Sequence, residues 1–131
     1  MIGLDTNILL RLWLNDDPVQ NRRIDALLAE HGSVPGSLLV TDVVLVEAVW
    51  TLRSAFSQDK TAQLTAVRSL LDEPAFAFED RDAIGRAATL FEGASCGFAD
   101  CLVVAKHAHH GCDLTATFDR GMRKLHGVRM P

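Results

Sequence analysis

The sequence predicts an α/β fold in which a central, mostly parallel sheet of 4–5 short strands lies between layers of helices. Short apolar runs of strand length alternate along the chain with longer amphipathic segments of helical period, which is typical of a parallel sheet covered by helices. The chain has 131 residues, of which 48% are hydrophobic, the size and composition of one domain with a proper core. We therefore expect a single three-layer αβα domain over residues 1–131.

The expected strands are short, apolar and bounded by turn or cap residues. The first carries Ile2 and Leu4 and ends at Asp5. The others are expected at Leu38–Val40, Ala75–Phe78, Asp113–Thr117 and, as an edge strand, Val128–Met130.

Helices are expected where apolar residues recur every three or four positions. The clearest stripe is formed by Leu45, Val49, Leu52 and Phe56. Thr41 or Asp42 is expected to cap that helix, because both side chains accept hydrogen bonds from free backbone N–H groups. The expected helices are Ile8–Trp13, Val19–His31, Val43–Phe56, Thr61–Leu71, Asp80–Phe91 and Phe98–His110, with a helical turn at Asp119–Lys124.

Composition places few limits on function. The net charge of −4 is mildly unfavourable for a nucleic-acid-binding protein, which usually carries a basic face. The basic residues are unevenly distributed, however, with Arg22 and Arg23 forming one group and Arg120, Arg123 and Lys124 another. A solvated helix face and tail is the ordinary explanation for both groups. No apolar run reaches the roughly 20 residues of a membrane span, and the three cysteines suggest no disulfide framework. Without an export signal, we expect a cytoplasmic protein.

Four acids stand at positions that deserve a chemical explanation, although each also has an ordinary one. Asp5 ends a strand and suits a turn, and Asp119 suits an N-cap. Asp100 lies in the first turn of a helix, where the macrodipole favours an acid. Glu47 lies within a helix that is apolar on most sides, where a salt bridge with Arg53 is the ordinary explanation.

The joint pattern of these acids predicts a metal site. In a right-handed parallel fold, the ends of strands and the starts of the helices that follow them reach one edge of the sheet. Carboxylates gathered there repel one another unless a cation lies among them. Oxygen ligands suit Mg²⁺ or Mn²⁺ rather than zinc, and such an ion activates water and polarises a phosphodiester. We expect Asp5, Glu47, Asp100 and Asp119 to form this site.

Four segments resemble the PIN domain in its VapC-type toxin branch. They are DTNILLRLW, VLVEAVWTL, FADCLVVAKHA and TATFDRGMRKL, which follow in the same order over essentially the whole chain. The resemblance implies a Mg²⁺/Mn²⁺-dependent endoribonuclease with a three-layer αβα fold, acting on RNA such as tRNA or rRNA. It also implies the toxin of a toxin–antitoxin pair, usually a homodimer, that is held inactive by a cognate antitoxin protein.

The resemblance assigns roles to the acids by position. Asp5 and Asp100 look like the principal metal ligands. Glu47 looks like the third acid, which holds metal or water, and Asp119 like the fourth. Because no acid of the pattern is missing, nothing in the sequence indicates an inactive enzyme.

Polar and basic neighbours complete the predicted site. Thr6 and Thr117 resemble the residues that orient water or phosphate in such enzymes. We expect in-line attack of a metal-activated water, which leaves a 5′-phosphate and a 3′-hydroxyl. Arg120, Arg123 and Lys124 are expected to hold the RNA backbone without regard to its sequence.

Other functions fit less well. A phospho-receiver needs a second acid beside the first, and an aspartyl phosphatase needs an Asp at the position of Asn7. A non-catalytic PIN-like module that binds RNA or protein, and a structure-specific DNA nuclease with the same acids, remain alternatives. Trp13 and Trp50 are expected in the core or a dimer interface. Cysteines and histidines without metal-ligand spacing are interpreted as core and surface residues: Cys96, Cys101, Cys112, His107, His109 and His110.

Overall fold

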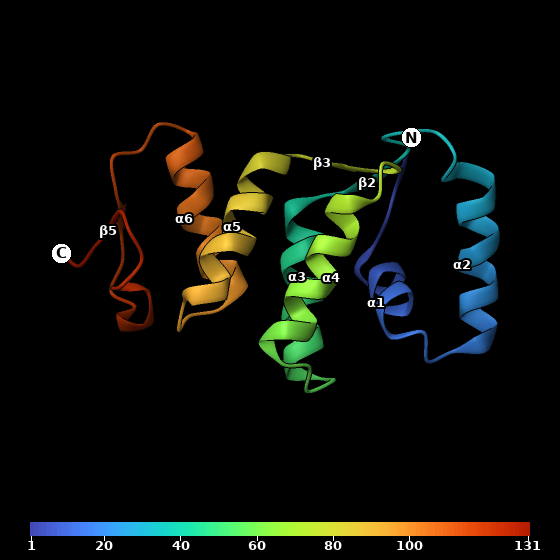
Figure 1. Ribbon diagram of the computed structural model, residues 1–131, viewed down its shortest axis with the longest axis horizontal. Coiled ribbons are helices and arrows are strands. Elements are labelled where there is room, and N and C mark those ends of the chain that lie inside the picture. The colour runs from blue at the N-terminus through green and yellow to red at the C-terminus, as the bar shows by residue number, and fades with distance from the viewer. The chain divides into compact units, whose positions relative to one another are not determined.

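The computed structural model describes all 131 residues of the chain, as two compact units (Figure 1). Unit 1 comprises Met1–Glu79 and unit 2 comprises Asp80–Pro131. The elements of unit 1 are β1 (Ile2–Gly3), α1 (Thr6–Leu14), α2 (Pro18–His31), β2 (Leu38–Val40), α3 (Asp42–Ser54), α4 (Lys60–Asp72) and β3 (Phe76–Phe78). The elements of unit 2 are α5 (Arg81–Gly93), α6 (Phe98–His109), β4 (Thr115–Ala116), the 3₁₀ turn η1 (Arg120–Met122) and β5 (Val128–Arg129).

The sheet of unit 1 is fully parallel and has the strand order β1-β2-β3. Ile2 lies opposite Leu38, which in turn lies opposite Phe76. The Leu4 N–H extends the first pairing by donating to the carbonyl oxygen of Leu39 at 2.9 Å. Because all three strands run the same way, their carboxyl ends lie at one edge, where Asp5 follows β1 and α3 follows β2.

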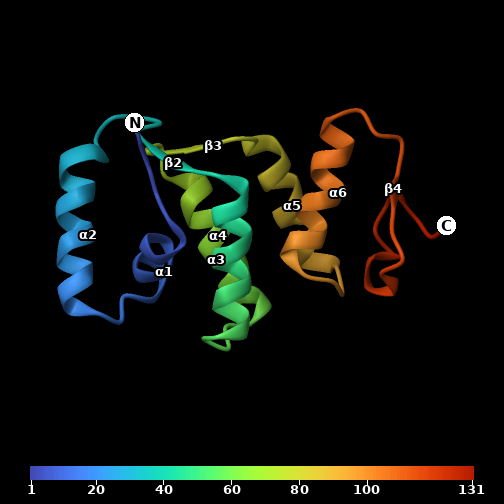
Figure 2. The same cartoon turned by 180° about the vertical axis from the view of Figure 1, so that it is seen from behind.

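Apolar side chains on the sheet and helices form the core of unit 1. Leu9, Leu38 and Leu45 are fully buried, one from each of α1, β2 and α3. Helix α1 packs against α2 and α3, and α3 packs against α4. Figure 2 shows α3 and α4 side by side from behind. Of the predicted stripe, Leu45, Val49 and Leu52 are buried on α3, whereas Phe56 is half-buried and lies beyond the end of the helix at Ser54.

The N-terminus of α3 is capped differently from the prediction. Thr41 occupies the N-cap position, but its side chain accepts no helix N–H. The Asp42 N–H instead donates to Oε1 of Glu79 at 2.7 Å, from a residue that directly follows β3. A carboxylate at a helix N-terminus is also favoured by the macrodipole, so Glu79 connects the end of the third strand to this helix.

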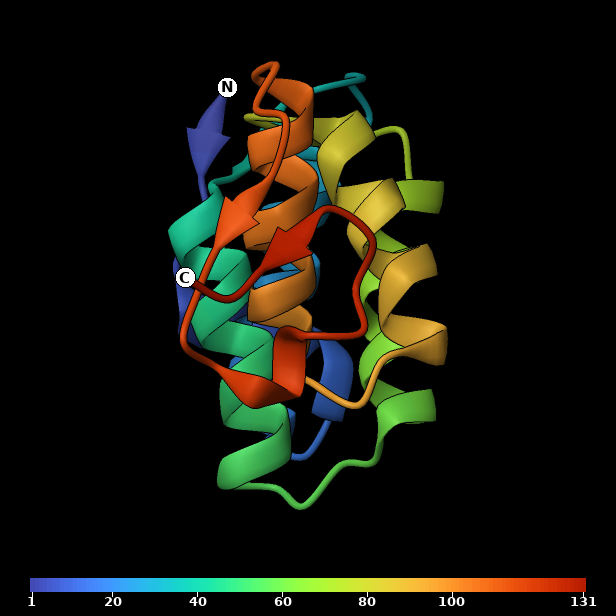
Figure 3. The same ribbon diagram turned by 90° about the vertical axis from the view of Figure 1, so that its left-hand side faces the viewer.

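Unit 2 is built on the pair α5 and α6, which pack against each other. Ile84 and Cys101 are fully buried, and the rings of Phe91 and Phe98 meet edge to face at 6.0 Å. Strands β4 and β5 pair in parallel, with Thr115 opposite Val128. Figure 3 shows these two strands side by side, with η1 in the connection between them.

The predicted elements are therefore confirmed in order and type, including the short strands and their parallel direction. The five strands form a three-stranded sheet in unit 1 and a two-stranded sheet in unit 2. No helix combines the length and the apolar character needed to cross a membrane.

Candidate metal centre

Asp5 has a carboxylate that no other group uses. It is the N-cap residue of α1 and is exposed, yet its side chain makes no capping hydrogen bond. Only its backbone oxygen takes part, by accepting from the Ile8 N–H at 3.1 Å. The ordinary explanation, a carboxylate engaged in the local turn, is therefore not what the structure shows. Both carboxylate oxygens of Asp5 are free to bind a ligand.

Thr6 places a buried hydroxyl beside this acid. The residue is 6% exposed, and its Oγ1 atom has no hydrogen-bond partner. A buried hydroxyl without a partner is unfavourable by about 1–3 kcal/mol. Buried polar groups are otherwise nearly always satisfied, so an orphan hydroxyl next to a free carboxylate is typical of a site that binds water or an ion.

Glu47 is exposed, although it lies on a helix whose sequence is apolar on most sides. Val43 and Trp50, at neighbouring positions of α3, are 73% and 59% exposed. The suggested salt bridge with Arg53 does not form. Apart from the backbone bonds of the helix, Glu47 makes one hydrogen bond, in which its backbone oxygen accepts from Thr51 Oγ1 at 2.8 Å. Its carboxylate is therefore as available as that of Asp5.

Asp100 lies in the first turn of α6 and is half-buried. Its carboxylate accepts no hydrogen bond, and the N-cap residue, Gly97, has no side chain to cap the helix. The macrodipole of this 12-residue helix favours a negative charge there, as predicted. That electrostatic benefit leaves the oxygen atoms of Asp100 unoccupied.

Asp119 differs from the other acids because it has a structural role. It is the N-cap of η1, and its Oδ1 accepts from the Gly121 N–H at 2.8 Å. The Asp119 N–H donates to Thr117 Oγ1 at 3.0 Å. The predicted N-cap is thus confirmed, and Thr117 holds the backbone of the same turn. The second carboxylate oxygen of Asp119 has no partner.

Two of the four acids, Asp5 and Glu47, belong to unit 1, and the other two, Asp100 and Asp119, belong to unit 2. In unit 1, Asp5 follows β1 and Glu47 lies on the helix that follows β2, at the edge where the strands end. In unit 2, a Cβ on Gly121 would lie 3.9 Å from the Cβ of Cys96, which precedes the start of α6. The turn that holds Asp119 therefore lies beside the loop that leads to Asp100. Neither unit by itself gathers three or more His, Cys, Asp or Glu residues into a metal-binding cluster.

The available donors fit a hard divalent cation. Within their own units the carboxylates of Asp5, Glu47 and Asp100 are unpaired, and the orphan Thr6 hydroxyl adds another oxygen. No cysteine or histidine belongs to this set. Oxygen donors of this kind are those that Mg²⁺ and Mn²⁺ prefer.

Two features of unit 1 were not predicted from the sequence. Glu79 follows β3 as Asp5 follows β1. The expectation that acids directly after parallel strands lie at one edge of the sheet therefore also applies to Glu79. Arg11 on α1 and Arg23 on α2 line a cleft between these helices. The sequence carried one signal for this cleft. Asn7 and Arg11 are four residues apart, so two polar side chains lie on the same face of α1.

The tryptophans have different environments. Trp13 packs against the buried residues Leu10, Leu52 and Ala66, in agreement with a core position. It also lines two clefts of about 440 and 420 Å³, and its buried Nε1 has no partner. Trp50 is 59% exposed and does not belong to the core of unit 1.

A parallel α/β chain with free acids after its strands is the pattern expected of a phosphodiester-cleaving metalloenzyme, and comparison with known proteins agrees. The PIN domain model matches residues 2–128, so the chain belongs to the PIN domain family. This confirms the predicted family and fold, and it places the chain in a family of nucleases that typically use divalent metals. A VapC ribonuclease of Aquifex aeolicus (strain VF5) is 25% identical over 122 residues, which cover 93% of this chain and 90% of that protein.

Proposed function

We propose that this protein is a Mg²⁺- or Mn²⁺-dependent endoribonuclease that hydrolyses RNA phosphodiester bonds in the cytoplasm as the toxin of a toxin–antitoxin pair. Its membership of the PIN family and its similarity to a VapC ribonuclease support this proposal. The observation that carries it is the carboxylate of Asp5, which follows β1, caps nothing and precedes Thr6, whose buried hydroxyl has no partner. The proposal treats the whole chain as one PIN domain.

Asp5, Glu47, Asp100 and Asp119 would together hold the metal, with Asp5 and Asp100 as the principal ligands. When bound, the cation would polarise the phosphodiester and lower the pKa of a bound water molecule. The oxygen of water forms a bond to phosphorus while the bond from phosphorus to the 3′-oxygen breaks. This hydrolysis leaves a 5′-phosphate and a 3′-hydroxyl, and it does not require the ribose 2′-hydroxyl.

The hydroxyls of Thr6 and Thr117 have different parts in the proposed site. Thr6 has no other use for its hydroxyl, so it is suited to orient the attacking water or a phosphate oxygen. Thr117 Oγ1 accepts from the Asp119 N–H and donates to Met122 Sδ at 3.8 Å. Its contribution is therefore to position Asp119 rather than to contact the substrate.

Basic residues after Asp119 would hold the RNA backbone. Arg120, Arg123 and Lys124 are exposed, and none of them forms an ion pair. Free cations next to a proposed metal ligand are suited to neutralise phosphates, with an affinity that falls as salt rises. If neutralising all three left RNA affinity and its salt dependence unchanged, this part of the proposal would be wrong.

The decisive experiment is incubation of the purified chain with total RNA in the presence of Mg²⁺, Mn²⁺ or EDTA. It is carried out beside Asp5→Asn and the control Asp25→Asn, the same change at an exposed acid on α2. We expect cleavage with either metal, none with EDTA, a loss of at least about 100-fold for Asp5→Asn, and no loss for the control.

Four outcomes would contradict the proposal. Cleavage that survives both EDTA and Asp5→Asn would exclude the metal mechanism, and a 2′,3′-cyclic phosphate product would exclude water as the nucleophile. Binding of RNA without cleavage under all metal conditions would identify a non-catalytic module. Cleavage of DNA in place of RNA would identify a DNA nuclease.

The toxin role and the partners need separate tests. Expression of the chain should arrest growth, whereas expression of Asp5→Asn should not. Co-expression of the cognate antitoxin protein should form a stable complex with the chain and restore growth. We also propose a homodimer, which light scattering would measure directly. Growth arrest by Asp5→Asn would contradict a role through RNA cleavage.

A further inference from the structure

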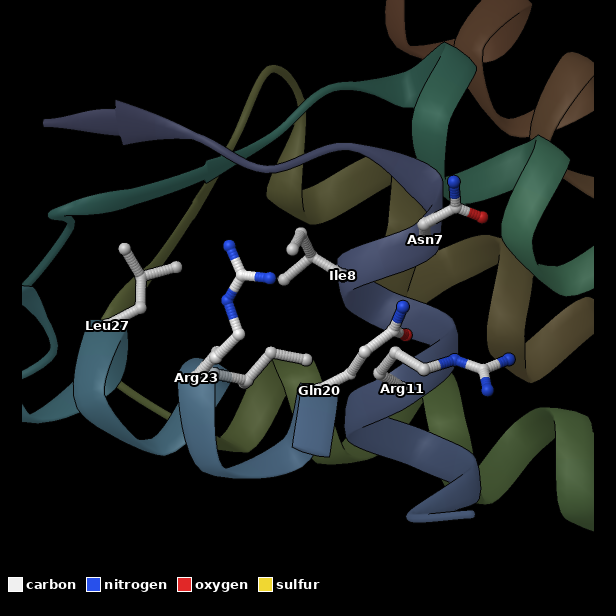
Figure 4. Close-up of a pocket in the computed structure, with 7 residues that line it drawn as sticks. Asn7, Ile8, Arg11, Gln20, Arg23 and Leu27 are labelled. Atoms are coloured by element: carbon white, nitrogen blue, oxygen red, sulfur yellow. The ribbon is translucent and has the colours of Figure 1, made fainter. Parts of the chain in front are cut away.

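A cleft of about 360 Å³ lies between α1 and α2 in unit 1, and no part of the proposed metal site uses it. Figure 4 shows the residues that line it, drawn from both helices. Its polar and charged members are Asn7, Arg11, Gln20 and Arg23, and its apolar members are Ile8, Ile24 and Leu27.

Arg23 is the free cation of this cleft. It is exposed and makes neither an ion pair nor a hydrogen bond. In Figure 4 its guanidinium extends from α2 toward Ile8 on α1, across the space between the two helices. Its neighbour Arg22 is also exposed but does not line the cleft. The adjacent arginines thus differ in position and not in charge.

Arg11 is a cation that is already held in place. Its Nη1 atom lies 2.6 Å from Oδ1 of Asp16, and its guanidinium lies 5.9 Å from the centre of the Phe56 ring. A guanidinium has five N–H donors, so the bond to Asp16 leaves others for a ligand. In Figure 4 this guanidinium lies on the side of α1 away from α2, so Arg23 is the cation that faces the space between the two helices.

The remaining lining suits a sugar–phosphate backbone. The side-chain amides of Asn7 and Gln20 make no hydrogen bond, and amides contact phosphate oxygens and riboses as readily as cations contact phosphates. The apolar floor gives the ribose a surface on which to pack. A cleft that combines the free guanidinium of Arg23, the free amide of Gln20 and an apolar floor matches the chemistry of an RNA strand.

The cleft and the proposed catalytic edge share helix α1. Asn7 is two residues beyond Asp5, and Arg11 is one helical turn further along the same face of α1. At about 1.5 Å per residue, Arg11 lies roughly 9 Å along the helix axis from Asp5. We propose that this cleft binds the backbone of the single-stranded RNA substrate, with Arg23 as its principal phosphate contact. This inference rests on the proposed ribonuclease function, because the ligand is the strand that Asp5 would cut.

The test measures binding without cleavage. A fluorescently labelled single-stranded RNA is titrated with the full chain in EDTA at several salt concentrations, and affinity is read by anisotropy. Arg23→Gln is compared with Arg22→Gln, an identical change on the same helix outside the cleft. We expect Arg23→Gln to lose roughly tenfold in affinity and to reduce the salt slope by about 0.7. Arg22→Gln should change affinity less than about twofold and leave the slope nearly unaltered.

A second variant separates charge from geometry. Arg23→Lys keeps the charge but loses the planar fork of donors, so it should retain the salt slope and lose part of the affinity. Equal losses for Arg22→Gln and Arg23→Gln would overturn the proposal, because the effect would then be net charge alone. Unchanged RNA binding together with loss of an antitoxin complex would also overturn it, since the cleft would then bind an acidic protein segment.

The outcome is distinguishable from failure of the proposed function. If the unaltered chain cuts RNA with metal while Arg23→Gln binds normally, only the cleft proposal fails. If the chain cuts no RNA but its binding depends on Arg23 and not on Arg22, the ribonuclease proposal fails and the RNA-binding cleft stands.

Discussion

A substitution at Thr6, the first residue of α1, separates a role in stability from a role in RNA cleavage. Its hydroxyl is buried with no partner, while its methyl group is buried with it. Thr6→Val keeps the shape and the β-branching and removes only the unsatisfied hydroxyl. We expect the free energy of unfolding to rise by about 1–2 kcal/mol, or roughly 4 °C per kcal/mol in Tm. If the hydroxyl orients water or phosphate, RNA cleavage should fall by about 10-fold to 100-fold.

Thr6→Ser gives the opposite pair of effects and serves as the control. It keeps the hydroxyl and removes one methyl group, so it should lose about 1 kcal/mol of stability and retain most of the cleavage activity. The measurements are urea unfolding followed by circular dichroism, and initial rates of RNA cleavage with Mn²⁺. A loss of stability in Thr6→Val would show that the hydroxyl has a partner in the folded protein. The orphan-hydroxyl reasoning would then be refuted.

Four further substitutions test burial and capping. Leu45→Ala should lower the free energy of unfolding by about 2–5 kcal/mol because Leu45 is fully buried, and a loss below about 1 kcal/mol in urea unfolding would contradict its place in the core. Asp17 accepts from two N–H groups of α2, at 3.1 and 3.0 Å, so Asp17→Ala should cost about 0.5–2 kcal/mol. Asp5→Ala, which removes an N-cap side chain that bonds to nothing, should cost almost nothing by the same measurement. Asp119→Asn keeps an acceptor for the Gly121 N–H but removes the charge, so it should preserve Tm and lower cleavage and metal affinity. A fall in Tm with unchanged metal affinity would assign Asp119 a purely structural role.

Most of the fold was predictable because local rules and packing agree in this chain. The stripe from Leu45 to Leu52 has the period of a helix, and the structure buries it. Asp119 was expected as an N-cap, and its carboxylate does accept the Gly121 N–H. The parallel strands followed from their alternation with helices, since a parallel pair requires a crossover.

The rest depends on groups that are distant in sequence. The cap of α3 comes from Glu79, which is 37 positions from Asp42, and no local capping rule detects such a partner. The exposure of Glu47 could not be predicted from the sequence, because its apolar neighbours Val43 and Trp50 left open whether this side of α3 faces solvent, and the structure exposes both. Arg23 acquires its position from the packing of α2 on α1, and two adjacent arginines look alike in a sequence. The gathering of the four acids around a cation stays a prediction.

Asp5 differs from the other aspartates of this chain that occupy a helix N-cap. Asp17, Asp59, Asp80 and Asp119 all occupy the N-cap of a helix, and the carboxylate of each accepts a backbone N–H from that helix. Asp5 occupies the same position on α1 and accepts none. Such a bond stabilises a helix by about 1 kcal/mol, so α1 begins without a contribution that α2, α4, α5 and η1 receive. The capping rule that the other four N-cap aspartates follow is thus broken at Asp5, and departures from such local rules are expected at functional sites. The unused carboxylate of Asp5, next to the unused hydroxyl of Thr6, is therefore better explained by a ligand than by the turn in which it lies.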